Sequence, residues 1–316
     1  MAIDEKTIDR AVSYVLPNIE AHRKQQQGEN GPTRPFVLAL SGLQGSGKST
    51  WATALAQRLN EHHHLKTIIV SLDDLYHTHE ELVRVRESNP QNTLFRNRGQ
   101  PGTHDEVLAE RFFKDLGSGR ELPLPRFDKS RFNGEGDRVP ESEWEVVPPN
   151  PPVNVLIFEG WCVGFQALPS DNLESKWNAA RELNTSSAQE EKLSTTVLGT
   201  HPLKHIKLLN DNLKRYNETF MGPSRFSYLI HLNTDQLVNV YKWRIEQEEA
   251  LRAAKGTGQT DDQVVAFVRV YMPAYELYLE RLQNEAFVPK SSASGLNTQL
   301  RIQLDIDRSI LAMEEL

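Results

Sequence analysis

The apolar residues of this chain form four short, nearly continuous runs. The runs cover residues 36–40, 66–72, 153–158 and 226–232. A run of this kind is typical of a strand whose two faces are both buried, as in a parallel sheet covered by helices. We therefore predict four strands at these positions.

Between these runs, apolar residues recur at the three- and four-residue spacing of amphipathic helices. The predicted helices cover residues 4–26, 48–60, 78–88, 105–116, 203–219, 236–254 and 261–283. Alternating strands and helices predict an α/β fold with a parallel sheet flanked by helices and right-handed crossovers. Residues 1–30 are predicted to be an N-terminal helical extension, which a Gly-, Asn- and Pro-rich segment at 27–35 joins to a single domain over residues 31–316.

Two stretches break the alternation of strands and helices. Residues 117–152 are rich in Pro, Gly and charged residues, which predicts a long structured excursion from the sheet. Residues 168–201 are polar and have few apolar side chains to anchor them, so we expect partial mobility there.

The bulk composition narrows the class of protein. The chain has 316 residues, a formal net charge of −7 and one cysteine, Cys162. The negative charge argues against a nucleic-acid or anionic membrane partner, and no apolar run is long enough to span a bilayer. A lone cysteine excludes an internal disulfide and fits a reducing compartment. The expected location is the cytoplasm, with a nuclear pool left open, and the oligomeric state is not predicted.

The segment after the first apolar run carries the clearest chemical pattern. Residues 42–49 are GLQGSGKS, which matches the phosphate-binding pattern GxxxxGK[ST] between a predicted strand and a predicted helix. The glycines let backbone N–H groups approach phosphate oxygens, and the helix N-terminus adds a positive dipole. We expect Lys48 to reach the β- and γ-phosphates of a nucleoside triphosphate, and the Ser49 hydroxyl to ligate Mg²⁺. The predicted nucleotide-binding residues are Gly42, Gln44, Gly45, Ser46, Gly47, Lys48, Ser49 and Thr50.

Three acidic residues follow the ends of other predicted strands. Asp73 and Asp74 come after the second apolar run, and Glu159 comes after the third. Because the carboxyl ends of parallel strands form one crevice, we expect these carboxylates to meet the phosphate loop in space. Asp73 is predicted to be the catalytic base, Asp74 to orient the acceptor or a metal-bound water, and Glu159 to hold the magnesium shell. The alternatives are helix capping for the aspartates and a solvated position for Glu159.

Further polar residues are candidates for the acceptor site. Asp105 is predicted either to cap a helix or to bind substrate hydroxyls. Arg126, Lys129 and Arg138 lie in charged loops, where they are either solvated or partners for a substrate carboxylate. Together with Asp74, the predicted acceptor-site residues are Tyr76, His104, Asp105, Arg126, Lys129 and Arg138.

A late predicted helix has the features of a lid. Arg244, Glu248 and Arg252 fall on one of its faces, which predicts either an exposed ladder of ion pairs or arginines that close over the transferring phosphate. The neighbouring run at 255–258 contains two glycines and is a candidate hinge for a lid over residues 242–262. Arg244 is the predicted catalytic arginine of this lid.

Seven motifs together resemble those of the D-glycerate 3-kinase family. They are SLDDLY (71–76), RGQPGTHD (98–105), PRFDKS (125–130), GEGDR (134–138), FEGWCVGF (158–165), WRIEQEEALR (243–252) and RVYMPAYELY (269–278). The resemblance covers most of residues 33–283, and the fungal members look most similar. It relates the chain to the wider P-loop group of uridine kinase, phosphoribulokinase and pantothenate kinase, and implies a P-loop NTPase fold.

The resemblance also implies an activity and assigns roles to residues. The implied activity is ATP-dependent phosphorylation of a small hydroxylated metabolite, glycerate being the family's known substrate. The phosphate loop falls on residues 42–50, the acid after the second strand on Asp73, the substrate-region acid on Asp105, the acid after the third strand on Glu159 and the lid arginine on Arg244.

These observations predict a small-molecule kinase that uses ATP and Mg²⁺, with D-glycerate or a similar hydroxy acid as acceptor. One alternative is a P-loop kinase with a different acceptor, such as a nucleoside or a pantothenate-like compound. Another is an ATP-binding regulatory protein without turnover. A GTPase-like switch is disfavoured, because the chain has no Asn-Lys-x-Asp string to select guanine.

Overall fold

The computed structural model describes residues 3–26, 34–186, 192–256, 258–290 and 295–316. Most of the predicted linker at 27–35, including the predicted boundary after residue 30, lies outside the described residues. The same is true of residues 187–191 in the polar stretch and of Thr257 in the candidate hinge.

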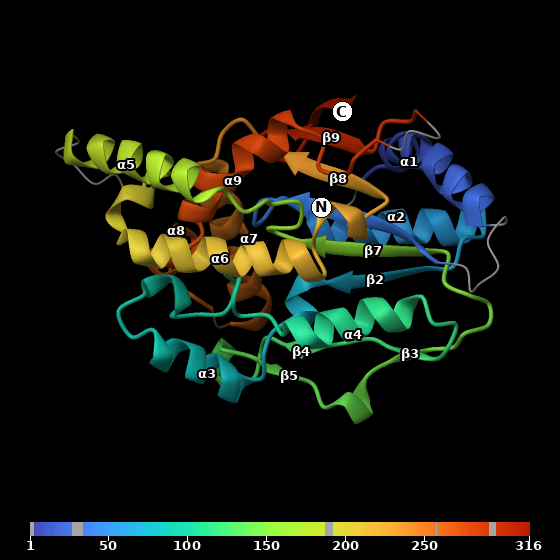
Figure 1. Cartoon of the computed structure of the whole chain (residues 1–316), viewed down its shortest axis with the longest axis horizontal. Coiled ribbons are helices and arrows are strands. Elements are labelled where there is room, and N and C mark those ends of the chain that lie inside the picture. The colour runs from blue at the N-terminus through green and yellow to red at the C-terminus, as the bar shows by residue number, and fades with distance from the viewer. Residues whose placement is uncertain (1–2, 27–33, 187–191, 257, 291–294) are drawn as a thin grey trace.

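A six-stranded sheet in the order β10-β9-β8-β1-β7-β2 forms the centre of the fold (Figure 1). Its strands are β1 (Phe36–Gly42), β2 (Thr67–Ser71), β7 (Val155–Gly160), β8 (Tyr228–Asn233), β9 (Gln299–Leu304) and β10 (Ile310–Glu315). Strands β2, β7, β1, β8 and β9 are parallel, and β10 runs antiparallel to β9 at one edge. Every residue of β1, β7 and β8 is buried, which confirms these apolar runs as strands covered on both faces. The prediction of four strands was incomplete, because β9 and β10 extend the sheet.

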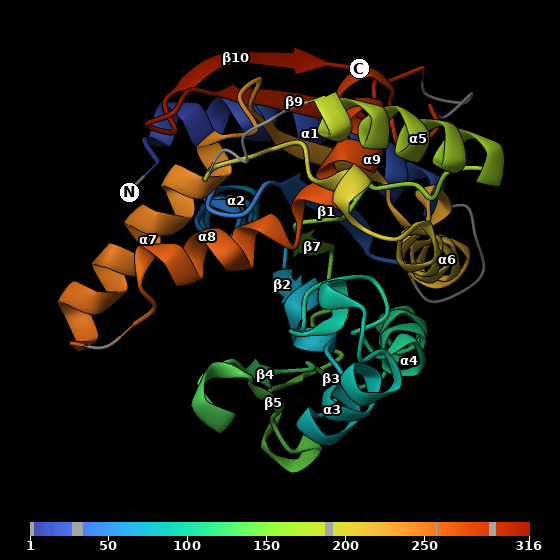
Figure 2. The same cartoon turned by 90° about the vertical axis from the view of Figure 1, so that its left-hand side faces the viewer.

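Helices cover both faces of the sheet, and Figure 2 shows α2 and α6 on opposite sides of it. The α-helices of the described residues are α1 (Glu5–Gln26), α2 (Lys48–His63), α3 (His79–Ser88), α4 (Glu106–Leu116), α5 (Ser170–Ser186), α6 (Leu203–Thr219), α7 (Asn239–Lys255), α8 (Asp261–Arg269) and α9 (Met272–Asn284). Short 3-10 turns lie at Leu72–Leu75, Thr93–Phe95, Phe132–Gly134, Glu141–Glu143, Leu198–Thr200 and Pro223–Arg225.

One prediction about helices was wrong, and one helix was not predicted. The helix expected over 261–283 is two helices, since α8 ends at Arg269 and α9 begins at Met272. Pro273, in the first turn of α9, has no N–H to donate into a helix continuing from α8. The polar stretch at 168–201 carries α5, whose Trp177 Nε1 donates to the His201 carbonyl at 2.8 Å.

Two features project from the sheet at the carboxyl ends of parallel strands (Figure 2). An arm formed by α7 and α8 follows β8. A lobe with α3 and α4 follows β2, and it includes the excursion predicted at 117–152. In the lobe, short strands pair antiparallel: β3 (Leu122–Pro123) with β6 (Val146–Val147), and β4 (Phe127–Asp128) with β5 (Asp137–Arg138).

The first helix shares one apolar core with the sheet. Ile8, Val12, Val15 and Ile19 of α1 are buried in the same cluster as the side chains of β1. The division of the chain into an extension and a domain therefore stays a prediction. Within the ranges described, no helix combines the length and the apolar character that crossing a bilayer would require.

Candidate active site

A cavity of about 850 Å³ lies where the phosphate loop, the lobe and the arm meet. The predicted site residues that line it are Gln44, Gly45, Gly47, Lys48, Ser49, Thr50, Asp73, Tyr76, Lys129, Glu159 and Arg244. Those that do not line it are Gly42, Ser46, Asp74, His104, Asp105, Arg126 and Arg138. Residues more than a hundred positions apart in sequence thus share one cavity, because the strands that carry them are parallel neighbours.

The phosphate loop connects β1 to α2 and leaves several of its polar groups free to bind an anion. Gly47 is the N-cap of α2 and provides no side chain to cap the first-turn N–H groups, which leaves them for an anion. The Lys48 Nζ atom donates to the carbonyls of Gly42 at 2.9 Å and Leu43 at 3.2 Å. Burial lowers the pKa of Lys48 from its ordinary value. The buried Ser46 hydroxyl has no partner, which leaves a further polar atom in the loop unused.

Position 45 accepts only glycine, because of its backbone conformation and its close neighbour in α7. Its φ of +82° lies in the left-handed region, which favours glycine, and a Cβ there would sit 2.5 Å from the Cβ of Trp243 in α7. The phosphate loop and the base of the arm are therefore in direct contact.

Ser49 and Glu159 form the link between α2 and β7. The Ser49 hydroxyl donates to Oε1 of Glu159 at 3.1 Å, and the Glu159 side chain is buried at the end of β7. A hydroxyl beside a carboxylate is the hard-oxygen donor set that Mg²⁺ takes, together with phosphate and water. The described residues contain no cluster of three or more His, Cys, Asp or Glu that could hold a metal alone. This donor set therefore fits a Mg²⁺ that depends on the nucleotide for further ligands.

The two adjacent aspartates differ in environment. Asp73 faces the cavity: its Oδ1 accepts from the Tyr76 hydroxyl at 2.8 Å and its Oδ2 from the Lys129 ammonium. Burial opposes ionisation of Asp73, but the Lys129 charge and these two hydrogen bonds lower its pKa to about 2. Asp74 instead accepts from the backbone N–H groups of Ser71 and Phe127, and burial raises its pKa to about 6. Asp74 thus caps the turn after β2 and ties it to β4.

The remaining predicted acceptor residues do not line the cavity. The Asp105 carboxylate caps α4 through the Leu108 N–H at 2.9 Å and also accepts from Arg138 at 2.9 Å. His104 is buried, contacts the Tyr216 hydroxyl through Nδ1 at 3.0 Å and stacks on Tyr76. Arg126 is exposed. Their predicted contact with an acceptor stays a prediction.

The arm brings Arg244 to the cavity. Its guanidinium lies 5.5 Å from the Phe267 ring centroid and 3.9 Å from the Glu248 carboxylate. The Nε atom of Arg244 has no hydrogen-bond partner. Arg252 instead pairs with Asp261 of α8 at 2.9 Å, on the outer part of the arm. Glu248 is buried and accepts from the Gln259 N–H at 2.7 Å, so it ties α7 to the loop that leads into α8.

Sequence reasoning missed several residues that line the cavity, among them Arg98, Trp161 and Tyr271. The Arg98 guanidinium stacks 5.3 Å from the Phe127 ring centroid and donates to the Gly134 carbonyl at 2.7 Å. The only signal for Arg98 was its place at the start of the motif at 98–105. Its aromatic partner lies in a different loop, and no sequence spacing connects the two.

Comparisons with known proteins agree with this geometry. No protein-family model matches the chain. The chain is 37% identical over 254 residues to the uncharacterized kinase mug58 of Schizosaccharomyces pombe, covering 80% of this chain and 84% of that one. It is 33% identical over 291 residues to the probable ATP-dependent kinase TDA10 of Saccharomyces cerevisiae, covering 89% of each. Among solved structures, a D-glycerate 3-kinase from Cryptococcus neoformans superposes with a TM-score of 0.81 at 30% identity, covering 98% of this chain and 99% of that one.

Proposed function

The chain belongs to the D-glycerate 3-kinase family of P-loop kinases and is an ATP-dependent small-molecule kinase, and we propose that its acceptor is D-glycerate or a similar hydroxy acid. One observation carries this proposal: a carboxylate, Asp73, shares the cavity of the phosphate loop with two cationic side chains, Lys129 and Arg98. A hydroxy acid offers these cations a carboxylate to bind, whereas a neutral acceptor such as a nucleoside does not.

The proposed reaction assigns each group a task. The acceptor oxygen bonds to the γ-phosphorus as the bond to the β–γ bridging oxygen breaks, and ADP leaves. Asp73 orients the acceptor hydroxyl and takes its proton. With Lys129 in place the pKa of Asp73 is about 2, so its carboxylate is ionised at neutral pH. When the acceptor displaces Lys129, the loss of that neighbouring charge raises the pKa and makes Asp73 a stronger base.

Cations surround the transferring group in this proposal. Lys48 exchanges its two carbonyl partners for the β- and γ-phosphate oxygens, and Arg244 reaches the γ-phosphate from the arm. Ser49 and Glu159 would hold Mg²⁺. The metal would supply positive charge that neutralises the triphosphate during transfer.

The carboxylate of the acceptor is assigned to Lys129 and Arg98. Lys129 is 56% exposed and rests on Asp73, so it can turn to an incoming anion without disturbing the core. Arg98 is held by Phe127 and the Gly134 carbonyl, which leaves it as the more rigid of the two cations. A cytoplasmic location and the absence of a nucleic-acid partner stay predictions, and the net charge of −7 supports the latter.

A coupled ADP-release assay with ATP and Mg²⁺ tests the acceptor. The panel holds D-glycerate, L-glycerate, glycerol, pantothenate and uridine at equal concentrations. We expect D-glycerate to stimulate ADP release above the acceptor-free rate and glycerol to be inert. Stimulation by pantothenate or uridine alone would agree with kinase activity but would contradict a hydroxy acid as the acceptor. No stimulation by any compound, with ATP bound, would favour the regulatory alternative.

A further inference from the structure

Arg308, near the C-terminus of the chain, contacts the phosphate loop. Its Nε donates to the Gly45 carbonyl at 2.8 Å, across 263 positions of sequence. One terminal nitrogen donates to Glu246 at 2.7 Å and the other to the Trp243 carbonyl at 3.4 Å. A single half-buried guanidinium therefore joins three elements: the hairpin of β9 and β10, the phosphate loop and the base of α7.

The Gly45 carbonyl belongs to a peptide group that is held on both sides. The N–H of the same peptide group, that of Ser46, donates to the Leu43 carbonyl at 3.1 Å inside the loop. Since a peptide group is planar and trans, its carbonyl and N–H point in opposite directions, and fixing both ends fixes the plane. Arg308 supplies the outer of these two contacts.

Arg308 and its hairpin turn also contact the base of the arm through Trp243. The Arg308 guanidinium lies 5.5 Å from the Trp243 ring centroid, and Trp243 Nε1 donates back to the Ile306 carbonyl in the same hairpin turn at 2.6 Å. Trp243 is fully buried and is the residue against which Gly45 packs. The turn between β9 and β10 lies beside the base of α7 (Figure 2).

The backbone of Arg308 gives an independent reason to assign it a function. Its φ of +66° lies in the left-handed region, at the end of a tight turn closed by the Asp305 N–H and the Ser309 carbonyl at 2.9 Å. Turns of this kind favour Gly or Asn at that position, because a side chain there is strained. An arginine at a position that favours Gly or Asn indicates that its side-chain contacts compensate for the backbone strain.

We propose that Arg308 is a positioning residue for ATP: it sets the plane of the Gly45–Ser46 peptide group and the base of the arm before the triphosphate arrives. It acts through Gly45 and Trp243 and does not line the cavity itself. The inference rests on ATP binding at the phosphate loop and is independent of which acceptor the kinase uses.

The test is Arg308→Gly in the full chain, with the dissociation constant for ATP measured by calorimetry without acceptor. Glycine relieves the strained backbone and so offsets part of the stability that is lost with the Arg308 contacts, and the melting temperature should fall by no more than a few degrees. Loss of the charged contacts to Gly45 and the arm should weaken ATP binding about tenfold or more. Arg308→Lys should recover part of the affinity, because it keeps the charge but not the three-way geometry.

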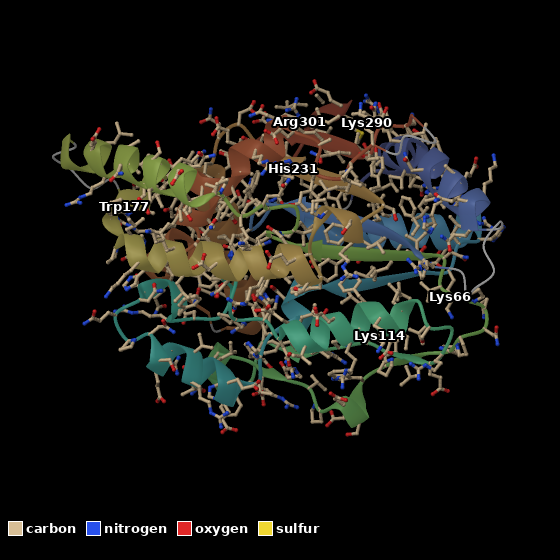
Figure 3. The ribbon with its side chains drawn as sticks, in the orientation of Figure 1. Lys66, Lys114, Trp177, His231, Lys290 and Arg301 are labelled. Carbon is tan, nitrogen blue, oxygen red and sulfur yellow. The ribbon has the colours of Figure 1, made fainter. Side chains whose placement is uncertain are left out.

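Arg301→Gln is the matched control. Arg301 lies on β9 of the same hairpin (Figure 3), and its guanidinium contacts Glu314 and the Gln283 carbonyl instead of the phosphate loop. The ATP affinity of the Arg301→Gln variant should stay within about twofold of the wild-type value. Wild-type ATP affinity in Arg308→Gly, whatever its melting temperature, would overturn the proposal. Because no acceptor is present, an inert D-glycerate in the earlier assay would not affect this result.

Discussion

The Tyr76 hydroxyl donates a 2.8 Å hydrogen bond to Oδ1 of Asp73, while Lys129 holds the other oxygen. Both oxygens of the proposed base are thus occupied before an acceptor binds. Tyr76 is buried, so its bond is the fixed one, whereas Lys129 is 56% exposed. An acceptor hydroxyl therefore approaches Asp73 most easily at Oδ2, by displacing the lysine.

Replacing the base should slow the chemical step. We expect Asp73→Asn to lower kcat by about 10²- to 10⁴-fold, because an amide accepts a proton poorly. ATP affinity should change little, because Asp73 is assigned to the acceptor. Steady-state kinetics beside ATP calorimetry separates the two effects. Asp128→Asn, a nearby carboxylate that contacts Ser130 and does not line the cavity, is the control. A kcat for Asp73→Asn equal to that of the control would remove the assigned role.

Replacing Lys48 of the phosphate loop should lower kcat/KM for ATP. In Lys48→Met the charged contacts to the β- and γ-phosphates are lost, at about 1.5–3 kcal/mol each, so kcat/KM for ATP should fall by roughly 10²-fold or more. Burial lowers the pKa of Lys48, which means that the folded state disfavours its charge. The variant should therefore melt no lower than the wild type, and scanning calorimetry checks this. Unchanged kcat/KM would contradict the loop geometry.

Replacing Lys129 should weaken binding of the acceptor. Lys129→Met removes one cation for the acceptor carboxylate, so KM for D-glycerate should rise about tenfold or more. Lys129→Arg should keep a lower KM than Lys129→Met. ADP-release kinetics over a range of D-glycerate concentrations gives both values. If Lys129→Met leaves KM for D-glycerate unchanged, the acceptor carboxylate binds elsewhere.

Replacing the arm arginine should affect turnover more than binding. Arg244→Gln removes a cation that is assigned to the transferring phosphoryl group, so kcat should fall about 10- to 10³-fold. Arg252→Gln lies on the same helix but pairs with Asp261 on the outer arm, and it should keep kcat within about twofold. Equal losses in the two variants would indicate general damage to the arm.

Stability should depend on pH through Glu276. Its Oε1 accepts from the N–H groups of Val197 and Leu198 at 2.7 and 2.8 Å, and burial raises its pKa from 4.5 to about 7. The folded state keeps this proton to higher pH than the unfolded state does. The contribution of Glu276 is therefore largest below pH 4.5 and falls by up to about 3 kcal/mol as the pH rises to 7.

Glu276→Gln mimics the protonated acid and still accepts both N–H groups. Relative to the wild type, the variant should be similar near pH 4.5 and more stable near pH 8. Urea denaturation at both values measures the difference in the free energy of unfolding. A difference that is the same at both pH values would exclude Glu276 as the titrating group.

Local patterns in the sequence predicted the centre of the fold. The pattern at 42–49 is recognisable because phosphate binding fixes both residue types and spacing, and β1, β7 and β8 are apolar because both faces are covered. β9 was missed because its sequence QLRIQL has the alternation of a half-buried strand instead of the continuous apolar run by which the other parallel strands were predicted. α5 lacks a broad apolar stripe, and contacts such as that of Trp177 with His201 hold it in place.

The candidate site was predictable only where the ends of strands defined it. Glu159 lies at the carboxyl end of β7 and Asp73 in the turn after β2, so the parallel topology brings them to the phosphate loop. Arg98 and Arg308 reach their positions through loops and a hairpin whose paths depend on tertiary packing. Asp74 shows the converse limit: it neighbours Asp73 in sequence, but the turn after β2 directs it to backbone N–H groups.

The order of the strands has a consequence for biosynthesis. β1, which leads into the phosphate loop, lies inside the sheet between β7 and β8, and β8 pairs in turn with β9. During translation, Gly45 leaves the ribosome 263 residues ahead of Arg308. A nascent chain therefore lacks the Arg308 contact to the phosphate loop until residue 308 has been synthesised.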